Sequence, residues 1–316
     1  MRRLQKIDIA RGIALIGMVI YHCSWDLSFF GYISDQIPQS GVLLLLARSV
    51  AAAFLFLAGF SLFLAQNAGF RPKAFFRRFT VILLCAALVS STTWVFMPQD
   101  FIYFGILHAV ACAALVGLLF LHTPLWLNCA VIALCFSLPH IGLDLPYPAL
   151  WWLGLSRAAA PSFDYVPFFP WFAWALAGQS LAAFMARRAR LHILQDGIRP
   201  ITLSRFLQFL GRHSLVIYLV HQPLLIAALY GFSCLVLPSY NFARAALQQD
   251  CVESCLLQNT EQICRDFCNC SLNALADKSL PGTYINGQIN IDDEAVAVIH
   301  AGCAAQLSAS PPAGKK

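Results

Sequence analysis

Charged residues are scarce in this chain, and their scarcity excludes most soluble architectures. Asp, Glu, Lys and Arg make up 11% of the 316 residues, whereas a soluble domain carries about 25%. Hydrophobic residues make up 59%, and the mean hydropathy is +0.68. A water-facing surface would lack polar cover, so the sequence predicts an integral membrane protein with the lipid bilayer as its first partner.

Several motifs of soluble enzymes are also missing. The chain contains no G-x-S-x-G elbow, P-loop, Rossmann glycine pattern or zinc-protease motif, which excludes the commonest chemistries of soluble active sites. The formal charge is +6, but the basic residues flank apolar segments, where they set membrane orientation. We therefore expect no nucleic-acid partner, and we assign no metal ligands.

Long apolar segments dominate the first three quarters of the chain. Crossing a hydrocarbon core takes roughly 20 apolar residues, and seven segments approach or reach that length. The predicted fold is all-α, a polytopic transmembrane helical bundle of about seven spans. These spans are placed at 9–31, 41–66, 78–97, 101–121, 124–142, 166–186 and 214–237.

The distribution of basic residues predicts the orientation of the spans. Alternating the loops puts one set of basic residues on a single side, which the positive-inside rule identifies as the cytoplasm. The opposite loops carry Arg157 alone. With an odd number of spans, the N-terminus is cytoplasmic and the C-terminus lies outside. The cytoplasmic set is Arg2, Arg3, Lys6, Arg71, Lys73, Arg77, Arg78, Arg187, Arg188, Arg190, Arg199, Arg205 and Arg212.

The end of the chain is polar and rich in cysteine, so we expect a membrane domain at 1–237 and a polar tail at 238–316 with a disordered end. An even number of thiols in a short outside segment indicates disulfides. Helical spacing suggests two antiparallel helices joined by two disulfides, with a third disulfide from the remaining thiols; a metal site is the alternative. The expected pairs are Cys251–Cys268, Cys255–Cys264 and Cys270–Cys303.

Ionisable residues inside apolar spans are candidates for function, because each costs about 3 kcal/mol or more at bilayer depth. His22 and Asp26 lie four residues apart in the first span, close enough to pair on one helix face. A carboxylate so placed fixes the imidazole tautomer and raises its basicity, as a general base or nucleophile requires. A pair that only satisfies itself is an equally good interpretation.

Depth estimates group further residues with this pair. At about 1.5 Å per residue, Arg48 and His108 fall at a similar level of the outer leaflet as His22. We therefore expect a catalytic group of His22, Asp26, Arg48 and His108. His221 precedes Pro223 and either supports a helix kink or contacts substrate. Arg11 either pairs with Asp8 or meets an anionic donor.

Four segments resemble the heparan-alpha-glucosaminide N-acetyltransferase catalytic-domain family, which also includes bacterial domains of unknown function. The broader acyltransferase-3 group shares an Arg-Gly and a downstream His in its first span. The resemblance covers about residues 1–237 and does not include the tail. Its segments are Ile7-Asp8-Ile9-Ala10-Arg11-Gly12-Ile13-Ala14 with Met18, His22 and Asp26-Leu27; Arg48 with Phe54-Leu55-Phe56-Leu57-Ala58-Gly59-Phe60-Ser61; Phe104-Gly105-Ile106-Leu107-His108; and Leu219-Val220-His221-Gln222-Pro223.

The resemblance implies an acyltransferase of the bacterial inner membrane. It would move an acetyl or other acyl group from cytosolic acyl-coenzyme A to an extracytoplasmic, carbohydrate acceptor. Carried over, His22 is the catalytic histidine and Asp26 its orienting carboxylate, while Arg48 and His108 line the reaction chamber. Arg11, Arg77 and Arg78 would meet the donor, and His221 would contact substrate. Oligomeric state stays open, with a homodimer among the alternatives.

Two other functions remain open from the sequence. A proton-coupled transporter would use the same His, Asp and Arg side chains as a relay and would not need coenzyme A. A membrane scaffold for the cysteine-rich tail would tolerate loss of His22 without any change beyond stability.

Overall fold

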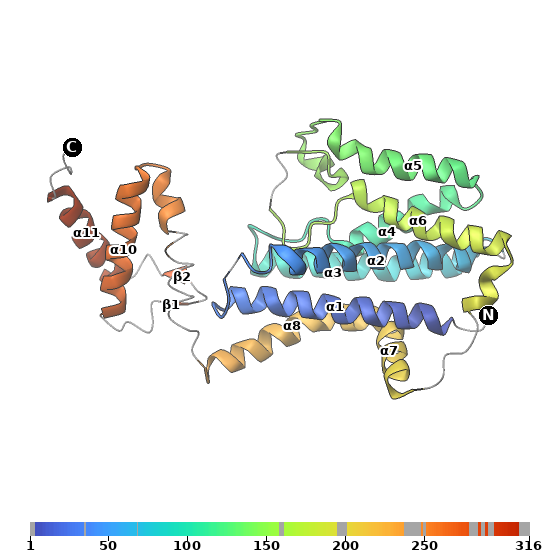
Figure 1. The fold of residues 1–316 in the computed structure, drawn as a ribbon, viewed down its shortest axis with the longest axis horizontal. Coiled ribbons are helices and arrows are strands. Elements are labelled where there is room, and N and C mark those ends of the chain that lie inside the picture. The colour runs from blue at the N-terminus through green and yellow to red at the C-terminus, as the bar shows by residue number, and fades with distance from the viewer. Residues whose placement is uncertain are drawn as a thin grey trace. The chain divides into compact units, whose positions relative to one another are not determined.

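Most of the described residues are helical (Figure 1). The structure is a computed structural model that describes residues 4–34, 36–67, 69–157, 161–194, 201–236, 248, 251–277, 284–285, 288–289 and 294–309. Within these residues the only strands are β1 (Tyr284–Ile285) and β2 (Gln288–Ile289), which pair antiparallel.

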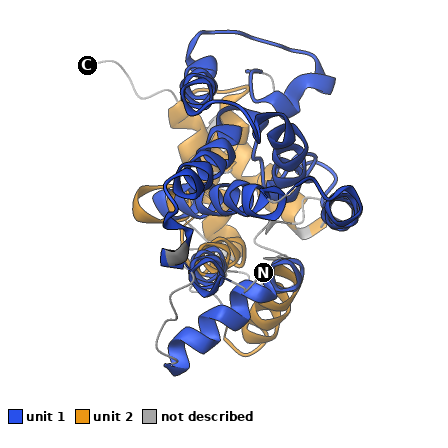
Figure 2. Ribbon diagram, turned by 90° about the vertical axis from the view of Figure 1, so that its right-hand side faces the viewer, with its two compact units in different colours: residues 1–19, 45–221 blue, residues 20–44, 222–316 orange. Residues whose placement is uncertain are grey.

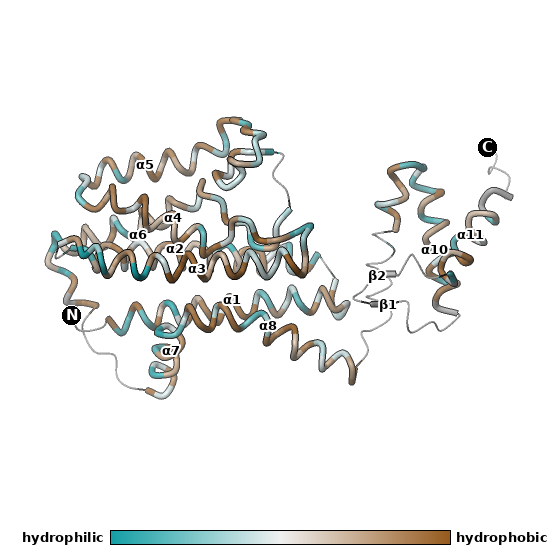
Figure 3. Tube along the Cα trace, turned by 180° about the vertical axis from the view of Figure 1, so that it is seen from behind, coloured by the Kyte–Doolittle hydropathy of each residue, from teal (hydrophilic) through white to brown (hydrophobic). Residues whose placement is uncertain are grey.

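Seven helices overlap the seven predicted spans, which confirms a polytopic helical membrane protein. Five of them are long and apolar enough to cross a membrane: α1 (Gln5–Phe29), α2 (Gly41–Gln66), α3 (Pro72–Phe96), α6 (Phe168–Arg187) and α8 (Ser214–Ser233). Two are shorter, α4 (Ile106–Gly117) and α5 (Leu125–Ser137), and each continues into a 3₁₀ turn, at Leu118–Phe120 and Leu138–His140. Hydrophobic stretches run along α2, α3 and α8 (Figure 3).

The fourth span begins later than predicted, at Ile106 rather than at residue 101. Two hydroxyls of α3 hold the preceding loop outside the helix. Thr93 accepts a hydrogen bond from the Ile102 amide at 3.0 Å, and Ser90 donates to the Ile102 carbonyl at 2.5 Å. With both backbone groups of Ile102 taken by side chains, the residue cannot join the helical hydrogen-bond ladder.

The chain forms two compact units, coloured separately in Figure 2. The first contains residues 1–19 and 45–221, and the second contains residues 20–44 and 222–316. In the first unit, α5 packs against α6, and α4 packs against both α3 and α6. The expected boundary at 237–238 lies outside the described residues.

Two glycines allow α2 and α6 to pack closely in the first unit. Gly59 of α2 lies against the carbonyl of Ala175, and Gly178 of α6 lies against the carbonyl of Phe56. A Cβ atom at either position would collide with backbone of the other helix. Small residues at helix contacts are the usual means of close packing in membranes.

A further helix, α7 (Thr202–Arg212), was not predicted. Its Ser204, Gln208 and Gly211 are buried, whereas large apolar residues on its other face are exposed. Such an amphipathic helix suits the membrane–water interface, where its apolar face reaches the acyl chains. The exposed apolar residues are Leu203, Phe206 and Phe209.

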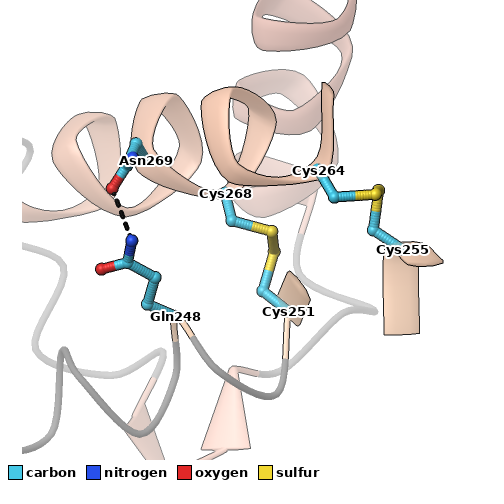
Figure 4. The surroundings of a disulfide bond; sticks show 6 residues. All are labelled: Gln248, Cys251, Cys255, Cys264, Cys268 and Asn269. Carbon is cyan, nitrogen blue, oxygen red and sulfur yellow. Dashed lines mark hydrogen bonds between the residues drawn. A yellow bond between two sulfur atoms is a disulfide. The ribbon is translucent and has the colours of Figure 1, made fainter. Parts of the chain in front are cut away.

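The tail in the second unit carries three disulfides, Cys251–Cys268, Cys255–Cys264 and Cys270–Cys303. This is the pairing that helical spacing predicts. The first two join a helical stretch at 251–256 to α10 (Glu261–Asp277), and Gln248 donates a hydrogen bond of 2.9 Å to Asn269 beside them (Figure 4). The third joins α10 to α11 (Glu294–Ala309), and a small core of Leu275, Val296 and Ile299 lies between these helices.

Candidate functional site

A cavity of about 250 Å³ lies within the first unit, among α1, α2, α3, α4, α7 and α8. We call it the basic cavity, because three arginines line it. The rest of its wall is mostly aliphatic and aromatic. Its lining residues are Arg11, Phe54, Ala58, Arg78, Val81, Ile82, Ile106, Leu107, Val110, Gly211, Arg212, Ser214, Leu215 and Tyr218.

The positive charge of the basic cavity is only partly neutralised. Arg11 lies 3.9 Å and Arg212 lies 3.6 Å from the carboxylate of Asp8. Arg11 also donates a hydrogen bond of 2.6 Å to the Ser61 hydroxyl on α2. Three guanidinium groups against one carboxylate leave an excess of positive charge, which suits an anionic group such as a phosphate.

Close packing of α7 on α1 places these charges. Gly211 lies against the carbonyl of Asp8, and Gly12 lies against the carbonyl of Leu207. The two helices can approach this closely because neither glycine carries a Cβ atom. Arg212 thereby reaches Asp8 from a different helix, so the ion-pair network depends on the glycine contact.

A buried carboxylate lies beside the cavity wall. Asp164 Oδ2 accepts a hydrogen bond of 3.0 Å from the Ile106 amide at the start of α4 and one of 3.2 Å from the Tyr218 hydroxyl on α8. Burial raises the pKa of the Asp164 carboxyl, and these two hydrogen bonds oppose the rise. Both of its donors belong to residues that line the basic cavity.

His108 makes two hydrogen bonds near the start of α4. Its Nδ1 accepts from the Gly105 amide at 3.2 Å, so the ring proton belongs on Nε2, which lies 3.3 Å from the Ser90 hydroxyl. The side chain therefore caps the helix and links it to α3, as a capping-box residue does. Its predicted place in a reaction chamber stays a prediction.

The remaining predicted residues divide between the two units. His22 and Asp26 belong to the second unit, where Asp26 is 3% exposed and accepts a hydrogen bond of 2.6 Å from Gln222. Arg48 is exposed on α2 in the first unit, and Arg77 is not among the described residues that line the basic cavity. Of the four residues predicted to meet donor or substrate, the cavity thus includes Arg11 and Arg78.

His221 is buried on α8, and its Nδ1 lies 2.6 Å from the Tyr218 carbonyl. Its ring also contacts the ring of Tyr218, with centroids 5.7 Å apart. His221 therefore contacts Tyr218, which lines the basic cavity, but is not itself among the described lining residues.

Asp164, Tyr218 and Gln222 were not singled out from the sequence, and Arg212 was considered only for orientation. Asp164 lies in an irregular loop rich in Pro and aromatic residues, where no helical period points to a shared face. Gln222 carried a usable signal, since a polar amide beside His221 in an apolar span needs a buried partner. Among the described residues, no three His, Cys, Asp or Glu side chains lie close enough to hold a metal ion.

Comparison with known proteins gives one informative result. Neither a curated protein nor a solved structure matches this chain. The family model of the heparan-alpha-glucosaminide N-acetyltransferase catalytic domain matches residues 3–223, more than two thirds of the chain. The match includes every described residue that lines the basic cavity, and it ends before the cysteine-rich tail. The chain therefore belongs to the heparan-alpha-glucosaminide N-acetyltransferase catalytic-domain family.

Proposed function

We propose that this chain is a membrane acyltransferase that takes an acetyl or other acyl group from acyl-coenzyme A on the cytoplasmic side. It passes that group to an extracytoplasmic, carbohydrate acceptor. The observation that carries the proposal is the basic cavity. Three arginines with a single carboxylate partner among them suit the phosphates of coenzyme A, and the apolar wall beyond them suits its slender arm.

The proposed orientation places the N-terminus in the cytoplasm, the tail outside and the protein in the bacterial inner membrane. Two independent features support it. Arg71, Lys73 and the basic residues from Arg187 to Arg212 follow even-numbered spans, as the positive-inside rule requires of cytoplasmic loops. The tail carries three disulfides, which persist in oxidising compartments outside the cytoplasm.

In the proposed reaction, the acceptor amine or hydroxyl attacks the thioester carbonyl. His22 accepts the proton that the acceptor loses, the carbon–sulfur bond breaks, and coenzyme A leaves as the thiol once it gains a proton. Asp26, whose Oδ1 accepts a hydrogen bond from Gln222 and whose Oδ2 has no hydrogen bond within the described part of the chain, favours the protonated form of His22 through its nearby negative charge. Arg48 stabilises the oxyanion of the tetrahedral intermediate. His22 taking the acyl group itself is the alternative route. We propose that Arg11 and Arg78 bind the donor, and that Arg77 and His221 contribute to the binding of donor or substrate.

The test uses purified protein in detergent with radiolabelled acetyl-coenzyme A and glucosamine as acceptor. Wild-type protein should release coenzyme A and label the sugar, and His22→Ala should abolish both. His140→Ala is the matched control, because His140 is exposed on the turn after α5. Label retained on the wild-type chain, and absent from His22→Ala, would indicate the acyl-histidine route.

The rival function is a proton-coupled transporter with the same intramembrane residues. It predicts no release of coenzyme A, but uptake of solute into proteoliposomes when a pH gradient is imposed. Folded wild-type protein that gives this result would overturn the acyltransferase proposal. A scaffold would show neither activity, and His22→Ala would then change only the thermal stability.

A further inference from the structure

A second polar group lies along the basic cavity, one helical turn from its charged residues. Ser214 and Tyr218 of α8 both line the cavity and are four residues apart, roughly 6 Å along the helix. Ser214 follows Arg212 by two residues, whereas the Tyr218 hydroxyl contacts Asp164, which also accepts the Ile106 amide. A ligand whose anionic group contacts the arginines therefore has Tyr218 within reach of the atoms that follow that group.

Tyr218 offers an acceptor in this otherwise apolar part of the wall. Its hydroxyl proton is donated to Asp164 Oδ2 at 3.2 Å. The lone pairs of the phenol oxygen therefore remain for a ligand that brings its own N–H or O–H donor. Ser214, the other hydroxyl in the lining, is two residues from Arg212 and belongs to the charged end.

Asp164 fixes the direction of the Tyr218 hydroxyl and is itself held by a second hydrogen bond. The same oxygen, Oδ2, also accepts the Ile106 amide at 3.0 Å, so the carboxylate joins the first turn of α4 to α8. Without this acceptor the Tyr218 hydroxyl could rotate, and its lone pairs would lose their direction. Asp164 acts through Tyr218 and is a positioning residue.

The arm of coenzyme A needs hydrogen-bond acceptors when it enters an apolar cavity. The arm between its diphosphate and its thiol contains two amides, and each N–H that enters an apolar cavity needs an acceptor to offset its lost hydration. We propose that the Tyr218 hydroxyl, oriented by Asp164, accepts a hydrogen bond from an amide N–H of this arm. The proposal rests on the proposed function, because it takes acyl-coenzyme A to be the donor.

The experiment measures binding of two probes to full-length protein in detergent by calorimetry. Coenzyme A carries the arm, whereas adenosine 3′,5′-bisphosphate carries phosphates without it. Tyr218→Phe should weaken coenzyme A binding about three- to tenfold, the value of one neutral hydrogen bond, and should leave the bisphosphate unchanged. The substitution keeps the aromatic ring, so the packing of α8 is retained.

Variants of Asp164 test the positioning role. Asp164→Ala should weaken coenzyme A binding as much as Tyr218→Phe, and the double variant should be no worse than either one, because both remove the same contact. Asp164→Asn should bind coenzyme A as well as wild type does, since the amide oxygen of Asn can take the place of Oδ2. Thermal unfolding of each variant reports any loss of folding.

The outcomes separate this inference from the function on which it rests. Equal coenzyme A binding by wild type and Tyr218→Phe would overturn the inference and leave the acyltransferase standing. Equal weakening of both probes would also overturn it, because the effect would then be on the shape of the cavity. Wild-type protein that binds neither probe would contradict the proposed function itself.

Discussion

Gln222 of α8 donates its side-chain amide to Asp26 Oδ1 of α1 across 2.6 Å. The two residues are far apart in the sequence, and their bond ties the C-terminal part of α1 to α8 in the second unit. Asp26 is 3% exposed, and its other oxygen, Oδ2, has no hydrogen-bond partner among the described residues. Gln222 is therefore the partner that the structure gives to a costly buried carboxyl group.

Gln222→Met should destabilise the protein. The side chain keeps its length but loses its donor, and leaving Asp26 without that hydrogen bond should lower the free energy of unfolding by about 1–3 kcal/mol. The midpoint of thermal unfolding in detergent measures the effect. Leu224→Ala is the control, because Leu224 is exposed on the same helix and makes no buried polar contact. Equal stability of Gln222→Met and wild type would contradict the structural importance of the bond.

The apolar helices could be predicted from the sequence because span length and apolar content reflect bilayer thickness directly, whereas the amphipathic α7 gives no such signal. The disulfide pairs could be predicted because Cys251 and Cys255, like Cys264 and Cys268, are one helical turn apart. Neither prediction needed knowledge of how distant segments meet. The Asp26–Gln222 bond did need it, since nothing local to either residue names its partner.

The site was only partly predictable for the same reason. Arg11 and Arg78 could be predicted because each is a basic residue at or near the start of an apolar span. Asp164 lies in an irregular loop, and only the hydrogen bonds to Ile106 and Tyr218 show what it does. The late start of α4 was missed because hydroxyls on α3 compete for the backbone of Ile102, an effect that hydropathy does not record.

Arg78→Gln should weaken the binding of coenzyme A by about tenfold or more, because it removes a charge-assisted hydrogen bond worth about 1.5–3 kcal/mol. Arg205→Gln is a matched control with the same change of charge. Arg205 is exposed on α7 and does not line the basic cavity. Calorimetry with coenzyme A measures both. Similar weakening by both variants would mean that general electrostatic attraction, and not a contact in the cavity, holds the phosphates.

Gly178→Ala should destabilise the bundle, because the new Cβ atom would collide with the carbonyl of Phe56 on α2. Overpacking of this kind costs about 1–3 kcal/mol. Gly231→Ala is the control. A Cβ atom there meets no atom within 4 Å, and replacing a helical glycine by alanine stabilises by about 0.4–1 kcal/mol. Thermal unfolding should therefore move in opposite directions for the two variants, and a shift in the same direction would argue against close contact of α2 and α6.

Cys270→Ser combined with Cys303→Ser should release α11 from α10. The small core of Leu275, Val296 and Ile299 and the ring contact between Phe267 and His300 would then remain between the two helices. Loss of a native disulfide from a small domain typically costs about 2–5 kcal/mol. We expect protease to remove α11 from the double variant much faster than from wild type. The free thiols of the membrane domain provide the control: Cys129→Ser with Cys234→Ser removes two exposed thiols that form no disulfide and should leave the tail resistant.

Protease added outside intact spheroplasts should give the same contrast between the two double variants, because the proposed orientation exposes the tail there. Cleavage that occurs only after the membrane is broken would place the tail in the cytoplasm and reverse the orientation of every span.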